Sequence, residues 1–164
     1  MTARRVLVTG SRNWPWPATV TDALDAQRAR LRAGDVLVVV VGYDPDRDYP
    51  PGVDRIAHQW ARHHQRNPAA GLAAVAVEPH PADWRTCAPD CNPRDHGHRR
   101  ATRGGKLTHC PTAGFRRNAE MVETGADVAL AWCLDDSHGT VDCVARIRAA
   151  RMNVAAQFVY TPAA

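Results

Sequence analysis

The segment Val36-Leu37-Val38-Val39-Val40-Val41 is a run of six apolar residues, five of them valine, and it decides the fold. Valine favours strands because its branched side chain packs well on a pleated surface. Six consecutive apolar residues leave neither face of a strand suited to water. Such a strand is typical of the interior of a parallel sheet, where helices cover both faces.

Strand-like and helix-like stretches alternate along the rest of the chain. A short run rich in β-branched residues at 4–9 precedes a stretch of helical periodicity over about 17–32. After the valine run we expect the order helix 53–65, strand 71–78, helix 112–124, strand 126–132, helix 140–151 and strand 154–160. This rhythm predicts an α/β protein, a three-layer fold with a parallel sheet of about five strands and helices on both faces. A chain of 164 residues fits a single domain, 1–164.

Polar loops follow the predicted strands at one edge of this sheet. Ligands in such folds bind at the carboxyl ends of the strands, near the point where the strand order reverses. The loops expected there cover 10–14, 42–54, 80–84 and 134–140, and they are rich in Gly, Ser, Asp and Arg. The agreement between topology and loop chemistry predicts a ligand site along this edge.

Two arginines lie near the start of the predicted helix 112–124. Thr112 is the expected N-cap, so Arg116 and Arg117 follow closely, beside backbone N–H groups that have no partner in the helix. This arrangement suits an anion such as phosphate. The alternative for Arg117 is a surface salt bridge to Glu120 or Glu123.

Further candidates lie at the ends of neighbouring strands. The turn Gly10-Ser11-Arg12 could cradle a phosphate with its backbone N–H groups and its guanidinium. Gly139 and Thr140, at the start of another predicted helix, offer the same chemistry, or else they form an ordinary capping turn.

Four other side chains at this edge each admit two interpretations. Asp54 either orients a ribose hydroxyl or caps its helix, and Asp83 either belongs to a polar site or ends its strand. Trp14 and Trp84 either stack on a base or pack in the interior.

A polar insertion at 85–111 holds three of the five cysteines and three of the eight histidines of the chain. It contains few apolar residues, so burial alone cannot order it. Its ligand spacing, Cys87-x3-Cys91-x6-His98-x11-Cys110, is compatible with a tetrahedral, structural zinc ion. His96 is the alternative to His98 as a ligand, and a disordered loop with free thiols is the alternative to a metal site.

The positive charge of the chain is concentrated in and beside this insertion. Between Arg85 and Arg117 there are eight Lys and Arg residues and two Asp, so this segment has a net charge of +6. The whole chain has a net charge of +4, so the remaining residues together carry −2. This imbalance predicts an anionic partner, or else a solvated basic loop.

The composition also bears on compartment and membrane. No apolar run approaches the roughly 20 residues of a membrane helix, and the N-terminus does not resemble a signal peptide, so we expect a cytoplasmic protein without membrane contact. Five cysteines, an odd count, disfavour a disulfide framework. Cys133 and Cys143 fall in strand and helix patterns and are expected in the core.

Six motifs in this order resemble the SLOG superfamily, specifically its YspA-related group (DUF2493), which is found in bacteria and in actinobacteriophages. The resemblance spans nearly the whole chain, and the Cys/His insertion with His98-Arg99-Arg100 is similar to a version of the group. The matching motifs are Val-Thr-Gly-Ser-Arg-Asn-Trp (8–14), Pro-Gly-Val-Asp-Arg-Ile-Ala (51–57), Pro-Ala-Asp-Trp (81–84), Ala-Gly-Phe-Arg-Arg-Asn-Ala-Glu-Met (113–121), Ala-Asp-Val-Ala-Leu-Ala-Trp (126–132) and Ser-His-Gly-Thr (137–140).

The resemblance implies a Rossmann-like domain that binds a nucleotide or a nucleotide-derived signal, such as an ADP-ribose, an NAD-type molecule or a nucleoside monophosphate. The protein would then act as a sensor or a sequestering module. The residues expected to contact the ligand are Gly10, Ser11, Arg12, Gly42, Asp54, Trp84, Arg117, Asn118, Ser137, Gly139 and Thr140.

Relatives of this superfamily suggest two alternatives. Lonely Guy phosphoribohydrolases cleave nucleoside monophosphates, which makes an N-glycosidase or hydrolase with Asp54, Asp83 or Asp142 as the catalytic acid an alternative. The catalytic Glu of those enzymes falls on Cys143 here, which argues against the same mechanism. DprA binds single-stranded DNA, and the basic insertion makes nucleic acid another possible partner, although we do not favour it. Homo-oligomers are common among the relatives.

Overall fold

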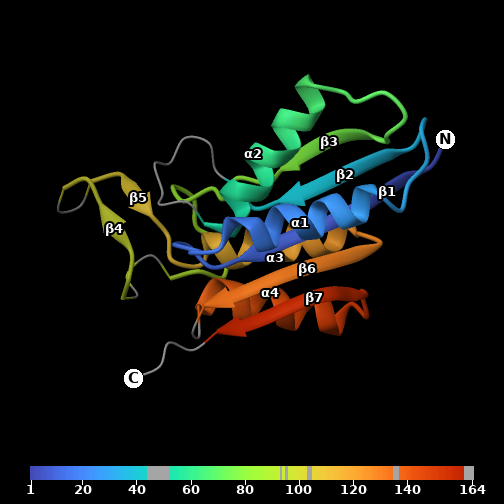
Figure 1. Cartoon of the computed structure of the whole chain (residues 1–164). Helices are drawn as coiled ribbons and strands as arrows, with labels where there is room; N and C mark the ends of the chain where they lie inside the picture. The colour runs from blue at the N-terminus through green and yellow to red at the C-terminus, as the bar shows by residue number, and fades with distance from the viewer. Residues whose placement is uncertain (44–51, 93, 95, 103–104, 135–136, 161–164) are drawn as a thin grey trace.

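The computed structural model describes residues 1–43, 52–92, 94, 96–102, 105–134 and 137–160, the last five by their backbone alone. It confirms the predicted α/β fold with a five-stranded parallel sheet (Figure 1). The elements are β1 (Ala3–Gly10), α1 (Pro17–Arg28), β2 (Val36–Val41), α2 (Val53–Arg66), β3 (Ala74–Pro79), β4 (Arg99–Arg100), β5 (Leu107–His109), α3 (Ala113–Thr124), β6 (Val128–Leu134), α4 (His138–Ala149) and β7 (Val154–Tyr160).

The strand order of the sheet is β3-β2-β1-β6-β7, and every neighbouring pair is parallel. The chain steps outward from β1 through β2 to β3, and then returns to the other side of β1 for β6 and β7. The order therefore reverses between β1 and β6, and the loops that follow these two strands diverge at that point. This is the switch point at which doubly wound folds bind ligands.

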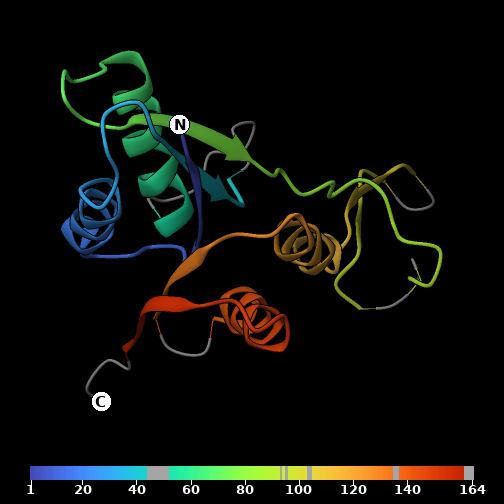
Figure 2. The ribbon, with the colours of Figure 1, turned by 90° about the vertical axis from the view of Figure 1, so that its right-hand side faces the viewer.

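Two helices cover each face of the sheet (Figure 2). Helices α1 and α2 pack together on one face, and α3 and α4 pack together on the other. Strand β1 shows how alternation builds the two cores: Val6 and Val8 face the α1–α2 side, whereas Leu7 faces the α3–α4 side. All three are fully buried, and each such side chain contributes about 1.5–3 kcal/mol to folding.

Most predicted boundaries differ from the observed ones by one to four residues. The runs at 36–41 and 154–160 are strands with the predicted limits. Helix α1 ends at Arg28 instead of 32, because the chain turns there through a hydrogen bond from Leu31 N to Arg28 O. Strand β3 begins at Ala74 instead of 71, and β6 and α4 are each displaced by two residues.

The insertion stands apart from the main sheet at the carboxyl ends of the strands (Figure 1). It contains β4 and β5, which pair antiparallel. Its two ends meet where Cys110 N donates a 2.7 Å hydrogen bond to Trp84 O. A small apolar cluster of Ala82, Cys110 and Ala113, with Trp84 against it, joins the insertion to the start of α3.

Candidate ligand cavity and metal centre

Two adjoining cavities lie at the carboxyl ends of the strands, around the switch point. The larger has a volume of about 490 Å³ and is bounded by the loops after β1 and β6 and by the first turn of α4. The smaller, of about 60 Å³, extends towards Tyr43, Ala82 and Trp84. Nine of the eleven predicted ligand residues line the larger cavity, and the remaining two, Gly42 and Trp84, line the smaller one. Ligand binding by these residues stays a prediction.

The turn after β1 is held by its own hydrogen bonds. Ser11 N donates to Trp132 O at 2.9 Å, and Ser11 Oγ accepts a 2.7 Å hydrogen bond from Leu134 N. The N–H of Ser11, predicted to help cradle a phosphate, is therefore already paired with Trp132 O, and the buried hydroxyl of the same residue ties β1 to β6. A Cβ at Gly10 would overlap Val53, so the strand end and the start of α2 approach each other because residue 10 has no side chain.

The Arg117 guanidinium contacts the residues that follow strands β2 and β3. Its Nη1 donates to Gly42 O and, at 3.4 Å, to His80 O, while its Nε donates to Asn118 Oδ1 at 3.1 Å. A Cβ at Gly42 would overlap the guanidinium, which explains why a glycine follows β2. The alternative salt bridge to Glu120 is not formed among the described residues, because that carboxylate contacts His80 Nδ1 instead.

Asn118 connects Arg117 to helix α4. The Asn118 side chain is buried, and its Nδ2 donates to Gly139 O at 3.0 Å and to Asp142 Oδ2 at 3.1 Å. Asp142 Oδ2 also accepts a 2.9 Å hydrogen bond from Arg146 Nε, within an ion pair. Asp142 lines neither cavity, so the structure places this candidate acid behind Asn118 and not at the site.

The two neighbouring arginines, Arg116 and Arg117, make different contacts. Arg117 faces the cavity, whereas Arg116 Nη2 donates to the carbonyl oxygens of Thr86 and, at 3.3 Å, of Asp83. Consecutive helical residues point about 100° apart, so both side chains cannot reach the same site. The prediction that the pair binds one anion is therefore wrong for Arg116. Thr112 precedes α3, as expected, but its side chain does not cap the helix.

Asp54 lies in the first turn of α2 and lines both cavities. Gly52 is the N-cap of that helix and no side-chain capping bond is made, which removes capping as the role of Asp54. Part of the residue is accessible, but Oδ1 is buried without a hydrogen-bond partner among the described residues. Burial raises the pKa of Asp54 to about 6, against the opposing influence of Arg117 and Arg12.

Asp83 and the two tryptophans take different positions from one another. Asp83 is exposed and lines neither cavity, and its carboxylate accepts a 3.2 Å hydrogen bond from Arg85 N in a turn. Trp14 is 5% exposed and packs in the core, where its Nε1 donates to Trp16 O. Trp84 lines the smaller cavity and stacks on His109, with ring centroids 5.0 Å apart.

Sequence reasoning missed some residues that line the cavities. Tyr43 follows Gly42 directly at the end of β2, and Asn13 and Leu134 also line the site. These three residues are neither charged nor glycines, and most of the predicted ligand residues were chosen for a charge or for a glycine turn. Their positions next to predicted strand ends were the available signal.

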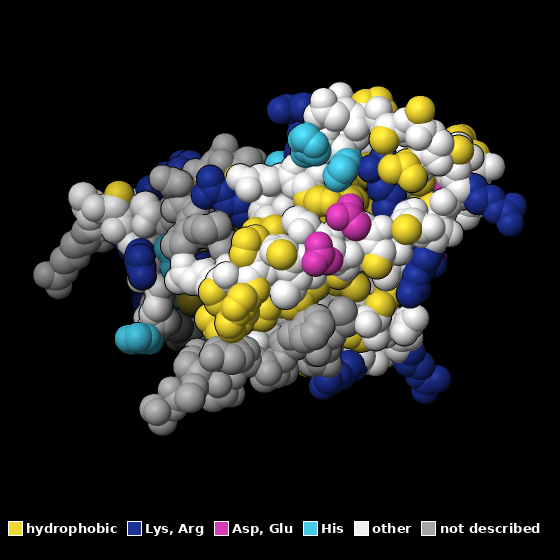
Figure 3. Space-filling view, viewed as in Figure 1, with side chains coloured by type: hydrophobic (Ala, Val, Ile, Leu, Met, Phe, Trp, Pro, Cys, Tyr) yellow, Lys and Arg dark blue, Asp and Glu magenta, His cyan; other side chains and the backbone are white. Residues whose placement is uncertain are grey.

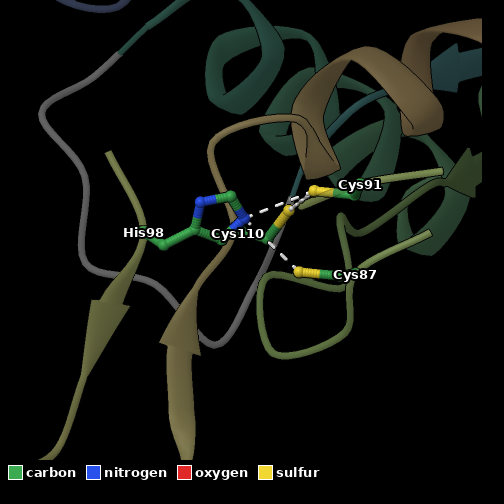
Figure 4. A group of neighbouring side chains, drawn as sticks. All are labelled: Cys87, Cys91, His98 and Cys110. Atoms are coloured by element: carbon green, nitrogen blue, oxygen red, sulfur yellow. Dashed lines mark hydrogen bonds between the residues drawn. The ribbon is translucent and has the colours of Figure 1, made fainter. Parts of the chain in front are cut away.

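The four predicted metal ligands converge in the insertion (Figure 4). The ligand atoms of Cys87, Cys91, His98 and Cys110 all lie within 4.8 Å of one another, and such a group can bind a metal ion. His98 Nε2 is 3.4 Å from Cys87 Sγ and 3.3 Å from Cys91 Sγ, and the sulfurs of Cys91 and Cys110 are 3.6 Å apart. His96 is exposed and lies outside the cluster.

The surroundings of Cys110 suit a metal-binding thiolate. Burial raises the pKa of the Cys110 thiol, but hydrogen bonds from the Thr112 hydroxyl and N–H, together with those of Cys91 and Cys87, lower it to about 6. Thr112 Oγ1 lies 3.1 Å from Cys110 Sγ. The hydroxyl that was expected to cap α3 therefore contacts the sulfur.

The remaining two cysteines are core residues, as predicted. Cys133 and Cys143 are both buried. Burial raises the pKa of the Cys143 thiol to about 11, so this residue is neutral at physiological pH.

No helix in the described part of the chain is both long and apolar enough to cross a bilayer.

Comparisons with known proteins identify a phage protein as a relative of this chain. No protein-family model matches the chain, and no solved structure matches it. The Gene 61 protein of Mycobacterium phage D29 is 38% identical over 141 residues, which cover 86% of each chain. The chain therefore belongs to the same protein family as the Gene 61 protein of Mycobacterium phage D29.

Proposed function

We propose that this protein binds a nucleotide or a nucleotide-derived ligand at the carboxyl edge of its sheet, as a sensor or a sequestering module. The observation that carries the proposal is the cavity of about 490 Å³ at the switch point, which Arg12 and Arg117 line together with the first turn of α4. Its volume falls within the range of about 300–1,000 Å³ that is typical of small-molecule sites.

The larger cavity suits the phosphate of such a ligand. The first N–H groups of a helix have no carbonyl partners within the helix and carry partial positive charge. Ser137, Gly139 and Thr140, at the start of α4, line the same cavity as Arg117. Because hydrogen bonds to Asn118 and Gly42 hold the guanidinium, little side-chain entropy remains to be lost when an anion binds.

The similarity of six motifs to the SLOG superfamily supports a nucleotide over other phosphorylated ligands. In this interpretation the smaller cavity, with Tyr43, Val53 and Trp84, receives the apolar part of the ligand. Candidate ligands are nucleoside monophosphates and molecules of the ADP-ribose or NAD type.

A nucleotide hydrolase is the second candidate, and Asp54 is the observation that favours it. A carboxyl group with a pKa of about 6 inside a ligand cavity is suited to donate a proton near neutral pH. The other two candidate acids, Asp83 and Asp142, line neither cavity. With one carboxylate at the cavity and a thiol at 143, the arrangement supports binding without cleavage more strongly.

We infer that the metal of the Cys/His cluster is a structural zinc ion. For zinc–sulfur and zinc–nitrogen bonds of about 2.3 and 2.0–2.1 Å, a tetrahedron has edges of about 3.8 Å between sulfurs and about 3.6 Å between sulfur and nitrogen. The separations of 3.6 Å and of 3.3–3.4 Å in the cluster are close to these values. Three cysteines and one histidine fill the four positions, which leaves none for a substrate.

The test is to incubate the metal-replete protein with AMP, ADP-ribose, NAD and cyclic dinucleotides, and to identify bound and released species by mass spectrometry. We expect one unaltered nucleotide to be retained, and Arg117→Ala to abolish its retention. Arg32→Ala, an exposed arginine before β2 and so at the opposite edge of the sheet, is the matched control. Release of a free base or a ribose phosphate, lost in Arg117→Ala, would establish the hydrolase instead. Retention of no nucleotide would refute the proposal.

A further inference from the structure

We propose that the stacked rings of Trp84 and His109 couple the metal centre of the insertion to the ligand cavity, so that His109 is a positioning residue for the nucleotide. This inference rests on the proposed function in one respect, because it takes the cavity as the nucleotide site. His109 precedes the metal ligand Cys110 but lies outside the cluster of four converging ligands.

Trp84 is held by Cys110 and by residues on either side of it. The Trp84 carbonyl oxygen accepts a 2.7 Å hydrogen bond from Cys110 N. The Trp84 ring stacks on the His109 ring, with centroids 5.0 Å apart and an angle of 8° between the planes, which is a favourable offset arrangement. A Cβ at Gly114 would lie 3.4 Å from Trp84 Cη2, so the ring also lies against the first turn of α3. The position of Trp84 therefore depends on the segment 109–114.

The same tryptophan is part of the cavity wall. Trp84 and Ala82 line the smaller cavity, and both lie in the loop after β3. Ala82, Cys110 and Ala113 form one apolar cluster, with Trp84 packed against it. A shift of Cys110 is therefore passed to two residues of the wall and to the start of α3, the helix that carries Arg117.

Two metal ligands fix His109 in turn. Arg99 of β4 pairs with His109 of β5, and the neighbours of this pair along the chain are the ligands His98 and Cys110. The insertion projects as a lobe at the left of the space-filling view (Figure 3), and it has few apolar residues to bury. Bonds to a metal ion therefore supply the order that burial cannot, and the ring of His109 takes its position from them.

This arrangement links the binding of metal to the binding of nucleotide. If zinc holds the wall in the shape that binds a nucleotide, a bound nucleotide raises the affinity for zinc by the same factor by which zinc raises the affinity for the nucleotide. A metal that only stabilised the insertion would leave the nucleotide affinity unchanged. The two roles can therefore be distinguished by measurement.

The first test needs no nucleotide. Hydrogen–deuterium exchange of the full-length protein is followed by mass spectrometry, with zinc bound and after removal of zinc with EDTA. We expect amide exchange in the segment 80–86 to become at least about 10-fold faster without zinc, whereas exchange in β1 and β2 stays unchanged. Equal rates in 80–86 with and without zinc would overturn the proposal.

His109→Ala removes the stack and keeps all four metal ligands. We expect this variant to retain one zinc ion per chain by elemental analysis, and yet to exchange in 80–86 as fast as the zinc-free wild type. His109→Phe, whose ring can stack but has no nitrogen for a metal, should restore slow exchange. His96→Ala, which removes an exposed ring of the same insertion, should behave as the wild type. Slow exchange in His109→Ala, or loss of its zinc, would refute the role assigned to His109.

The second test measures nucleotide affinity by isothermal titration calorimetry, with AMP, ADP-ribose, NAD and cyclic dinucleotides. For a nucleotide that binds, we expect the wild-type affinity to be about 5- to 100-fold higher with zinc than without it, and this ratio to fall to near one in His109→Ala. A ratio that His109→Ala leaves unchanged would refute the coupling alone. If no nucleotide of the panel binds the wild-type protein, the proposed function fails, and the exchange experiment decides the coupling by itself.

Discussion

Asn118 holds Arg117 in place: Asn118 Oδ1 accepts a 3.1 Å hydrogen bond from Arg117 Nε. The same buried amide donates to Gly139 O and to Asp142, on the neighbouring helix. One side chain thus couples the position of the cavity arginine to the first turn of α4, and both border the larger cavity.

Replacing Asn118 by Ala should loosen this arrangement. The carboxylate of Asp142 and the Nε of Arg117 would each lose a partner, and we expect the free energy of unfolding to fall by about 1–3 kcal/mol. Nucleotide binding should weaken as well, because Arg117 would no longer be held before the ligand arrives. Urea denaturation and calorimetry measure the two effects.

Glu123→Ala provides the comparison on the same helix, since Glu123 is exposed and lines neither cavity. A surface change of this kind should alter stability by no more than about 0.5 kcal/mol. If the two variants were equally stable and bound ligand equally well, the role assigned to Asn118 would be wrong.

Two glycines at the cavity should respond differently to Ala. A methyl group at Gly42 would overlap the Arg117 guanidinium, which lies at the end of a flexible side chain, so Gly42→Ala should displace that arginine and weaken nucleotide binding at only a small cost in stability. At Gly139, by contrast, a Cβ would have nothing within 4 Å, and Ala favours a helix by up to about 1 kcal/mol.

Gly139→Ala should therefore fold at least as stably as the wild-type protein, yet bind a nucleotide more weakly because its methyl group lies at the edge of the larger cavity. Thermal unfolding and calorimetry on both variants give the comparison. Unchanged binding in Gly139→Ala would show that the ligand does not approach the start of α4.

Stability should depend on the protonation of Asp54. Because its pKa in the folded protein is about 6, above the ordinary value of 3.8, the folded state binds the proton more tightly than the unfolded state. The raised pKa therefore makes its full contribution to the free energy of unfolding below about pH 4, and this contribution is lost as the pH rises from about 4 to about 6. The shift of about 2 pH units corresponds to a loss of at most about 3 kcal/mol.

We therefore expect Asp54→Asn to be close to the wild-type protein in stability at pH 4 and more stable at pH 7, as measured by urea denaturation. Asp83→Asn should show the opposite trend. Hydrogen bonds from Thr86 and Arg85 lower the pKa of Asp83, so its contribution is present at neutral pH and lost at low pH. If the difference in free energy of unfolding between wild type and Asp54→Asn did not vary with pH, the raised pKa of Asp54 would be contradicted.

The two neighbouring histidines provide a matched test of the metal centre. His98→Ala removes one of the four converging ligands, whereas His96→Ala removes an exposed ring outside the cluster. We expect one zinc ion per chain in the wild-type protein and in His96→Ala, and loss of tight binding in His98→Ala, by elemental analysis. A chelator should lower the melting temperature of the first two proteins. Equal metal content in both variants would exclude His98 as a ligand.

The layered fold could be predicted because its signals are local. The valine run at 36–41 and the largely apolar stretch at 154–160 are strands with the predicted limits, since short apolar stretches bounded by turn residues leave few alternatives. The group of metal ligands could also be predicted from its spacing, although the spacing left His96 open as an alternative to His98, and the structure places His98 in the cluster.

The division of roles within the site could not be predicted in the same way. Arg116 and Arg117 are neighbours with the same chemistry, and only the packing of α3 decides which of them faces the cavity. Asp142 resembled a catalytic acid in the sequence, but it pairs with Asn118 and Arg146 across two helices. The Ser11 hydroxyl is likewise committed to Leu134, 123 residues later, which no local pattern reveals.

The hydrogen bond between Trp84 O and Cys110 N makes the insertion a detachable unit, because the chain leaves the main sheet and returns to it at one point. We therefore expect that this insertion can be removed without altering the strand order of the main sheet. A chain in which a short Gly-Ser turn replaces residues 86–109 should keep the circular dichroism of the parent sheet. Loss of that signal would show instead that the metal centre is part of the folding unit.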